Sequence, residues 1–195
     1  LLNQALRVVK GEALYPEGIE SPPYLISNYP PVYVLINALL VAIVGPTLAV
    51  GRLISFLSTL GAAVMIALII QQFTKDKDFL PMLVGASIFL ITPYVLEWSP
   101  LFRIDMLGLF LSLTGLYLLI RNPEKNRNIY LAAGLFILAA YTRQSFGLAA
   151  PLAGIIYTYT KIKRKALRLL LTYAAGGLII FGSLYWLSGG AFFFH

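Results

Sequence analysis

The sequence predicts an all-α fold, a polytopic transmembrane helical bundle with a long first external loop. Hydrophobic residues make up 59% of the 195 residues and charged residues only 12%, whereas a soluble domain carries about 25% charged residues. The charges fall in short clusters between long apolar runs. Such a pattern marks membrane topology rather than a nucleic-acid-binding face, so we expect no nucleic-acid partner.

Six uncharged stretches provide the predicted membrane helices. The hydrocarbon core of a bilayer is crossed by about twenty apolar residues. The stretches hold twenty-two residues after Arg52, eighteen after Asp78, fifteen after Asp105, fifteen after Arg127, seventeen after Arg143 and twenty-seven after Arg168. We therefore treat 1–195 as a single transmembrane domain, with about six membrane helices in 53–188.

Three clusters rich in Lys and Arg set the predicted orientation. They are TKDKD (74–78), RNPEKNRN (121–128) and KIKRKALR (161–168). Cytoplasmic loops of membrane proteins carry the excess of Lys and Arg, so all three clusters are placed inside.

This orientation fixes the path of the later helices. The helix of 79–97 runs outward and that of 105–120 returns, which leaves the intervening RID motif at the outer face. The chain then forms a hairpin whose tip is YTRQSFG (141–147). The last span, 169–188, runs outward again.

The first 52 residues are predicted to form one external segment. Leu2, Leu6 and Val9 lie on one stripe of an amphipathic helix, because residues three and four apart share a helix face. The region 11–33 follows, with five prolines and four tyrosines and no helical period. Proline presets the backbone, so this composition is typical of an ordered loop.

The apolar run at 32–45 completes the external segment. Its fourteen residues suit a re-entrant or interfacial helix better than a full span. Gly45-Pro46 then ends the helix. A full span at 32–48 is the alternative, but it would place all three basic clusters outside.

Arg103 and Asp105 form the first candidate site at the outer face. If the backbone between them is extended, their side chains share a face. If Asp105 opens the next helix, it can also cap that helix and favour its positive end. Two interpretations stay open: a structural cap paired with an arginine, or a carboxylate held at the membrane surface and facing a cavity.

Arg143 and Gln144 form the second candidate site, between two short half-spans. A charge at membrane depth usually faces a cavity or a partner. A cation there would bind an anionic group such as a lipid phosphate, while the alternative is a salt bridge to Asp105 that serves folding only. Arg52, at the outer start of a predicted span, either reaches the headgroups or joins this site.

Several site classes have no signature in this sequence. There is no cysteine, hence no disulfide framework and no thiolate metal site. A glycine-rich phosphate loop, a zinc-ligand spacing and a Ser–His–Asp set are also missing, which argues against a cytosolic nucleotide site. No cofactor is assigned, and a divalent metal is left open because one carboxylate does not define a metal site.

Five short motifs, in this order and spacing, resemble those of GT-C type membrane glycosyltransferases. They are ALRVVKGEALY (5–15), SNYPPVYVLINALL (27–40), GRLISFLSTLGA (51–62), RIDML (103–107) and AAYTRQS (139–145). The similar groups are the protein O-mannosyltransferases, the bacterial aminoarabinose transferases of lipid A and bacterial mannosyltransferase-like proteins. The resemblance covers nearly the whole chain.

The resemblance implies a GT-C-like helical fold and a polyprenyl-phosphate-linked sugar donor, together with a membrane lipid environment. It also implies a multi-pass protein of the plasma (inner) membrane with its active site on the extracytoplasmic side. Family members carry an acidic residue just after their first span. Here that position falls upstream of Leu1, and Glu12 is not an obvious match. We therefore expect a fragment that lacks the N-terminal span and the C-terminal part.

The resemblance also suggests a role for each candidate residue. Asp105, the catalytic candidate, would orient the acceptor or hold a divalent metal. Attack on the sugar requires positive charge where the departing phosphate gains negative charge, and Arg143 would supply it with Gln144 as a supporting donor. Arg103 would position Asp105 or touch the phosphate. The substrate-binding candidates are therefore Arg103, Arg143, Gln144, the weaker candidate Arg52, and Tyr29, which would shape the sugar cavity.

Two other classes of protein share these features. A multi-pass transporter or lipid flippase would have the same spans and buried charges, but transporters often contain internal repeats. We find no repeat, and the polar residues gather at one face, which favours an enzyme. A structural membrane subunit without a site is the third class. The sequence does not identify the sugar, the acceptor or the oligomeric state.

Overall fold

The computed structural model describes residues 1–16, 26–74 and 78–194, and within these ranges the chain is helical and contains no β-strand. The prediction of an all-α fold is confirmed. Part of the proline-rich loop and the centre of the first basic cluster lie outside the described residues. The helices are α1 (Leu2–Val9), α2 (Pro31–Val44), α3 (Leu48–Gln71), α4 (Phe79–Ile91), α5 (Pro93–Trp98), α6 (Asp105–Arg121), α7 (Asn126–Ala140), the 3₁₀ helix η2 (Gln144–Gly147), α8 (Ala149–Lys161), α9 (Lys163–Leu187) and α10 (Ala191–Phe194).

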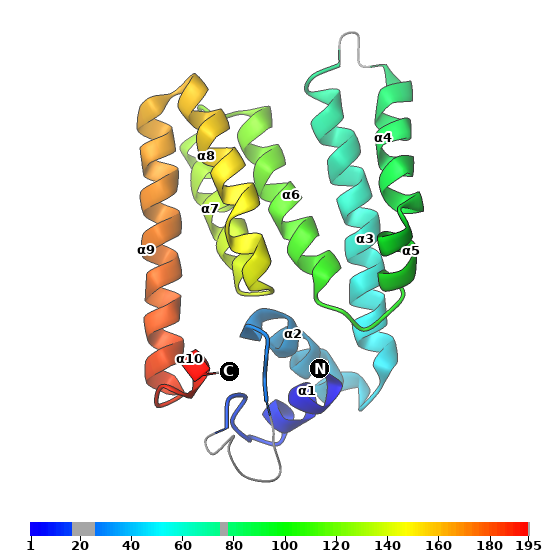
Figure 1. Ribbon diagram of the computed structural model, residues 1–195, viewed down its shortest axis with the longest axis vertical. Helices are drawn as coiled ribbons and strands as arrows, with labels where there is room; N and C mark the ends of the chain where they lie inside the picture. The colour runs from blue at the N-terminus through cyan, green and yellow to red at the C-terminus, as the bar shows by residue number, and fades with distance from the viewer. Residues whose placement is uncertain (17–25, 75–77, 195) are drawn as a thin grey trace.

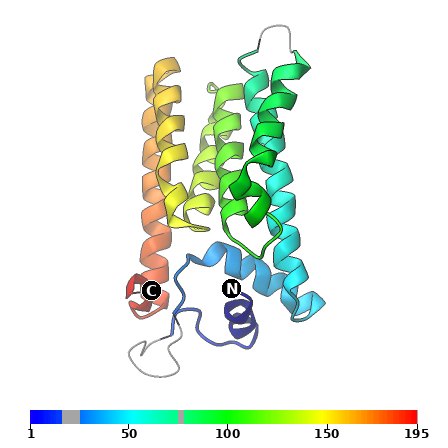
Figure 2. The same cartoon turned by 45° about the vertical axis from the view of Figure 1, so that its right-hand side comes forward.

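The long helices run lengthwise beside one another, and α1 and α2 lie across one end of them (Figures 1 and 2). The α6–α7 and α8–α9 connections lie at the opposite end, as do the last turn of α3 and the first turn of α4 (Figure 1). The residues 121–128 and 161–168 therefore share one end of the bundle, which we call the basic end. The end covered by α1 and α2 is called the α2 end.

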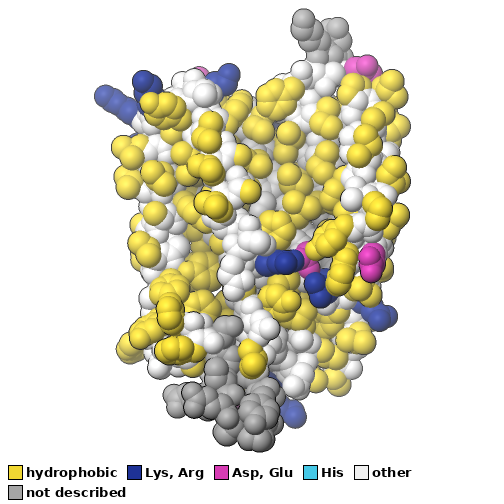
Figure 3. Space-filling model, in the orientation of Figure 1, with side chains coloured by type: hydrophobic (Ala, Val, Ile, Leu, Met, Phe, Trp, Pro, Cys, Tyr) yellow, Lys and Arg dark blue, Asp and Glu magenta, His cyan; other side chains and the backbone are white. Residues whose placement is uncertain are grey.

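The bundle exposes an unusually apolar surface. Within the described residues, α3 and α9 are each long and apolar enough to cross a membrane, and α2 and α4 are shorter apolar helices. Only 6% of the most apolar window of α9 is buried, so this helix is not the core of a soluble domain. Hydrophobic side chains cover most of the face seen in Figure 3. The fold is an all-α membrane bundle.

The predicted single helix over 79–97 is interrupted, which corrects the sequence-based expectation. Helix α4 ends at Ile91, Thr92 is extended (φ −58°, ψ 126°), and α5 starts at Pro93. The cause is Pro93, which lacks an N–H group and disfavours a helical backbone at the residue before it. The break lets α5 turn toward the start of α6.

Helix α1 packs through a different stripe from the predicted one. Ala5, with Leu1 and Val8 beside it, meets Val34 on α2, whereas Val9 is 44% exposed. A stripe at positions 1, 5 and 8 satisfies the same helical spacing as 2, 6 and 9. It is selected because the small side chain of Ala5 lets the two helices approach closely.

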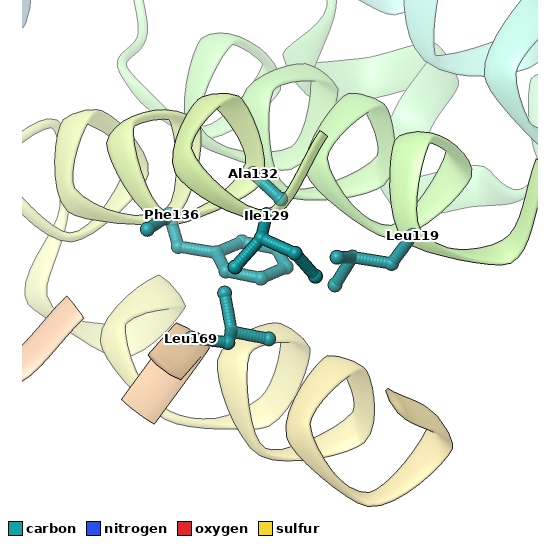
Figure 4. Close-up of a cluster of buried hydrophobic side chains, with 6 residues drawn as sticks. Leu119, Ile129, Ala132, Phe136 and Leu169 are labelled. Atoms are coloured by element: carbon teal, nitrogen blue, oxygen red, sulfur yellow. The ribbon is translucent and has the colours of Figure 1, made fainter. Parts of the chain in front are cut away.

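The best-packed core joins α6, α7 and α9 (Figure 4). Phe136 is fully buried at its centre. Its ring occupies the space that glycines leave open: a Cβ on Gly115 would lie 2.6 Å from its Cε1, and one on Gly154 would lie 3.2 Å from its Cε2. The remaining members of the cluster are Leu119, Ile129, Ala132, Ala133 and Leu169.

Replacing Phe136 with alanine should lower the free energy of unfolding by about 3–5 kcal/mol, since the cavity left by a buried ring adds to the lost burial. Thermal unfolding in detergent measures the change. Leu138→Ala is the matched control, because Leu138 lies on the same helix and is 43% exposed. Equal losses from both variants would contradict the packing described here.

Candidate active site

Charged side chains from separate segments converge on Asp105, the first residue of α6. Asp105 is only 3% exposed. Its Oδ1 forms an ion pair with Arg143 and accepts a hydrogen bond from the Tyr94 hydroxyl at 3.3 Å. Its Oδ2 lies 3.4 Å from Arg103 Nε. These four residues form what we call the Asp105 cluster, and Figure 3 shows charges gathered on the bundle side among hydrophobic side chains, away from the basic end.

The short step from Arg103 to Asp105 holds both groups of one ion pair. Ile104 between them is helical (φ −78°, ψ −20°) rather than extended, and Asp105 is the first helical residue, with no side-chain cap at this terminus. The capping interpretation is therefore wrong. The guanidinium carbon of Arg103 lies 4.1 Å from the centre of the Trp98 ring, a cation–π contact that orients the arginine.

Ser55 fixes the backbone that precedes Asp105. Its Oγ lies 2.7 Å from the carbonyl oxygen of Arg103 and accepts a hydrogen bond from the Arg103 N–H at 3.2 Å. The buried Tyr33 hydroxyl lies 3.2 Å from the same Oγ and donates to the Gly51 carbonyl at 2.9 Å. Helices α2 and α3 are thus tied to the loop that carries Arg103.

The position of Arg143 is set by the tip between α7 and η2. The Val32 N–H, in the first turn of α2, donates to the Tyr141 carbonyl at 3.0 Å, which satisfies a donor that the helix start leaves free. Phe146 packs where Gly108 has no side chain, since a Cβ there would lie 2.5 Å from the Phe146 ring. The tip therefore lies against the first turn of α6.

Charge in the Asp105 cluster does not balance. Asp105 supplies one carboxylate, and Arg103 and Arg143 supply two guanidinium groups whose side chains are 33% and 35% exposed. One positive charge is left over and partly accessible, beside a hollow of about 420 Å³ that Asp105 and Arg143 line with Phe89 and Met106. Such a group attracts an anion, and it does so more strongly where apolar walls limit screening.

A second, larger cavity of about 670 Å³ lies next to this hollow. Aromatic rings line it, including those of Tyr15, Tyr141 and Tyr173. The hydroxyls of these tyrosines donate to backbone carbonyls, Tyr15 to Tyr29 at 3.1 Å, Tyr141 to Gly177 at 2.7 Å and Tyr173 to Gly147. The ring faces therefore supply most of its wall, with the exposed Gln144 as a polar group.

The structure brings three of the predicted residues together and separates the others. Arg103, Asp105 and Arg143 share the Asp105 cluster. Gln144 and Tyr29 line the larger cavity instead. Arg52 is exposed on α3, and no hydrogen bond or ion pair between described residues connects it with the cluster.

Sequence reasoning missed three residues of this site. Tyr94 and Trp98 are four apart on α5, and side chains at that spacing share a helix face. The signal for them was Pro93, which favours the first position of a helix and so marks the start of α5. Ser55 gave no signal, because its contacts depend on how the loop folds back on α3.

The described residues around Asp105 do not fit a divalent metal ion. Among them, no group of three His, Cys, Asp or Glu side chains gathers anywhere. Both oxygens of Asp105 face guanidinium groups, whose charge repels a cation, whereas hard cations require several oxygen ligands.

Comparison with known proteins gave one match. A family model described as dolichyl-phosphate-mannose-protein mannosyltransferase matches residues 28–186. No curated protein and no solved structure matches significantly. The matched range includes the whole Asp105 cluster, the hairpin tip and both hollows except for Tyr15 and the residues at either end of the range.

Proposed function

The chain belongs to the dolichyl-phosphate-mannose-protein mannosyltransferase family, and we propose that it moves a sugar from a polyprenyl-phosphate-linked donor to an acceptor at the outer face of the membrane. The family makes it a GT-C type glycosyltransferase of the mannosyltransferase kind. One observation carries the finer proposal: the unbalanced positive charge of the Asp105 cluster beside an apolar hollow. A phosphate joined to a hydrocarbon chain has the matching combination of charge and apolar surface.

The reaction breaks the bond between the anomeric carbon and the phosphate oxygen and forms a bond to an acceptor hydroxyl oxygen. Polyprenyl phosphate leaves with the bonding electron pair, so negative charge grows on its phosphate. Arg143 stabilises this charge, because hydrogen-bond donors held where charge develops lower the barrier. Arg103, held over Trp98, supports the same phosphate.

Asp105 takes the proton that the acceptor hydroxyl loses, as a general base. Arg143, Arg103 and Tyr94 engage its carboxylate in the structure without a donor. When the donor phosphate draws the guanidinium groups toward itself, the carboxylate loses partners and becomes available to the acceptor. The proposal therefore predicts an order in which the donor binds before the acceptor.

The larger cavity is assigned to the sugar. Tyr29 and Gln144 line it, and Gln144 directly follows Arg143, so a group bound there lies next to the phosphate site. Aromatic walls with a few polar groups are typical of small-molecule sites. The amide of Gln144 provides the polar contact.

The proposed topology places the basic end in the cytoplasm and the Asp105 cluster on the extracytoplasmic side of the plasma membrane, with about six membrane helices in 53–188. The rule that cytoplasmic loops carry excess Lys and Arg supports it. The residues 1–52 would then form an external segment, with α2 lying at the membrane boundary.

The test uses the protein in proteoliposomes with polyprenyl phosphate mannose labelled in its sugar, together with a membrane extract as acceptor. We expect unlabelled polyprenyl phosphate to appear while the label enters the acceptor fraction. A transporter or flippase would instead move intact labelled donor across the bilayer. Intact donor after incubation, with or without translocation, would overturn the proposal.

A further inference from the structure

The basic end of the bundle carries the greater part of the positive charge of the chain. The residues 121–128 and 161–168 contain eight Lys and Arg residues and one acidic residue, Glu124, while the net charge of the full sequence is +7. Lys and Arg side chains gather over the ends of α8 and α9 in Figure 3, and the Asp105 cluster lies away from them. This end is therefore a separate place to look for an anion.

Two of these cations converge on one neutral group. Lys165 Nζ and Arg168 Nη1 both donate to Oδ1 of Asn126, Arg168 at 2.6 Å. Within the described part of the chain, no carboxylate pairs with either cation. Asn126 and Lys163 are the first residues of α7 and α9, so the positive ends of two helices add to the same field.

Like charges held this close repel one another, and a shared amide oxygen compensates for only part of that repulsion. An anion with several acceptor oxygens would replace it, as phosphate does when it binds Lys and Arg together. Other cations of this end are placed differently: Lys161 and Lys163 lie over the rings of Tyr157 and Tyr159. Lys165 and Arg168 are thus distinguished by geometry, not only by charge.

The surface next to these cations is apolar. Tyr130, one turn beyond Asn126 on α7, is 51% exposed, and Leu171, one turn beyond Arg168 on α9, is 58% exposed. A further turn along α7, a Cβ on Gly134 would meet nothing within 4 Å. A phosphate at Lys165 and Arg168 therefore has room beside it for hydrocarbon chains, which a soluble anion does not need.

We propose that Lys165, Arg168 and Asn126 bind the headgroup phosphate of an anionic phospholipid whose acyl chains lie along the exposed face of α7 and α9. The lipid lies in the leaflet at the basic end and fixes the ends of α7 and α9 relative to each other. This site is separate from the sugar-transfer site, and its occupation does not depend on the proposed function.

The test is native mass spectrometry of the detergent-solubilised protein, titrated with dioleoyl phosphatidylglycerol and with dioleoyl phosphatidylcholine. Wild type should bind phosphatidylglycerol more tightly. The double variant Lys165→Gln/Arg168→Gln should weaken that binding by about thirty-fold, because each basic side chain near a membrane surface contributes about a factor of five. Phosphatidylcholine binding should change little.

Two further variants make the result decisive. Lys163→Gln/Arg164→Gln removes the same charge from the same helix but leaves Lys165 and Arg168 in place, and it should retain most of the binding. Lys165→Arg/Arg168→Lys keeps both charges and should also retain it, which separates lost binding from lost folding. Equal weakening by both glutamine pairs, or full displacement of the lipid by millimolar inorganic phosphate, would overturn the proposal.

Discussion

Replacing Asp105 with asparagine should abolish sugar transfer while the protein remains folded. The substitution keeps the shape of the side chain but removes the only carboxylate among the described members of the Asp105 cluster. Loss of a general base lowers rates by about 100- to 10,000-fold. The rate of donor cleavage in proteoliposomes gives the effect, and thermal unfolding in detergent confirms the fold.

Two companion variants define this result. Glu97→Gln removes the same charge from an exposed position on α5 and should leave transfer near the wild-type rate. Tyr94→Phe removes only the 3.3 Å hydrogen bond to Oδ1 and should cause a smaller loss than Asp105→Asn. Near-normal transfer by Asp105→Asn would remove Asp105 from the mechanism.

The helical fold could be predicted because its signals are local. The length of each uncharged run and the placement of Lys and Arg between the runs follow from the thickness and charge of a membrane. The break between α4 and α5 was missed although Pro93 stands in the sequence. Counting uncharged residues measures only the distance between charges, and a proline leaves that distance unchanged while it interrupts the helix.

The side-chain directions explain which site residues could not be predicted. Gly51 and Ser55 face the interior of the bundle, and each helical residue is turned by about 100° from the one before it, so Arg52 points outward. Arg143 has an extended backbone (φ −153°, ψ 129°), and successive side chains of an extended segment point to opposite sides. Gln144 therefore enters the neighbouring cavity rather than the Asp105 cluster.

The convergence of Arg103, Asp105 and Arg143 could be foreseen from topology alone, because two outward turns of one bundle end at the same face. The partners that orient them could not. Ser55 contacts the backbone of Arg103 across 48 positions of sequence, and Trp98 reaches the Arg103 guanidinium only because α5 turns back after Pro93. Such contacts depend on the path of a loop, for which no periodic pattern exists.

Replacing Arg143 with alanine should reduce kcat for transfer by about 100- to 1,000-fold, as expected when a group that stabilises developing negative charge is removed. Arg143→Lys keeps the charge but lacks the planar fork that binds two phosphate oxygens, and it should recover part of the rate. Steady-state kinetics with the labelled donor measures both. Arg121→Ala, at the exposed end of α6 near the basic end, is the matched control and should behave as wild type.

The double variant Asp105→Asn/Arg143→Gln separates chemistry from folding, because the ion pair between the two residues would by itself explain a loss in either single variant. Breaking a buried pair leaves one charge unpaired, whereas a neutral pair of similar size restores the balance. We expect the double variant to unfold at a higher temperature than Arg143→Gln alone, since Asp105 is no longer left as a buried charge, and yet to remain inactive. If the pair served folding only, transfer would return together with stability, and the assignment of both residues to the reaction would be wrong.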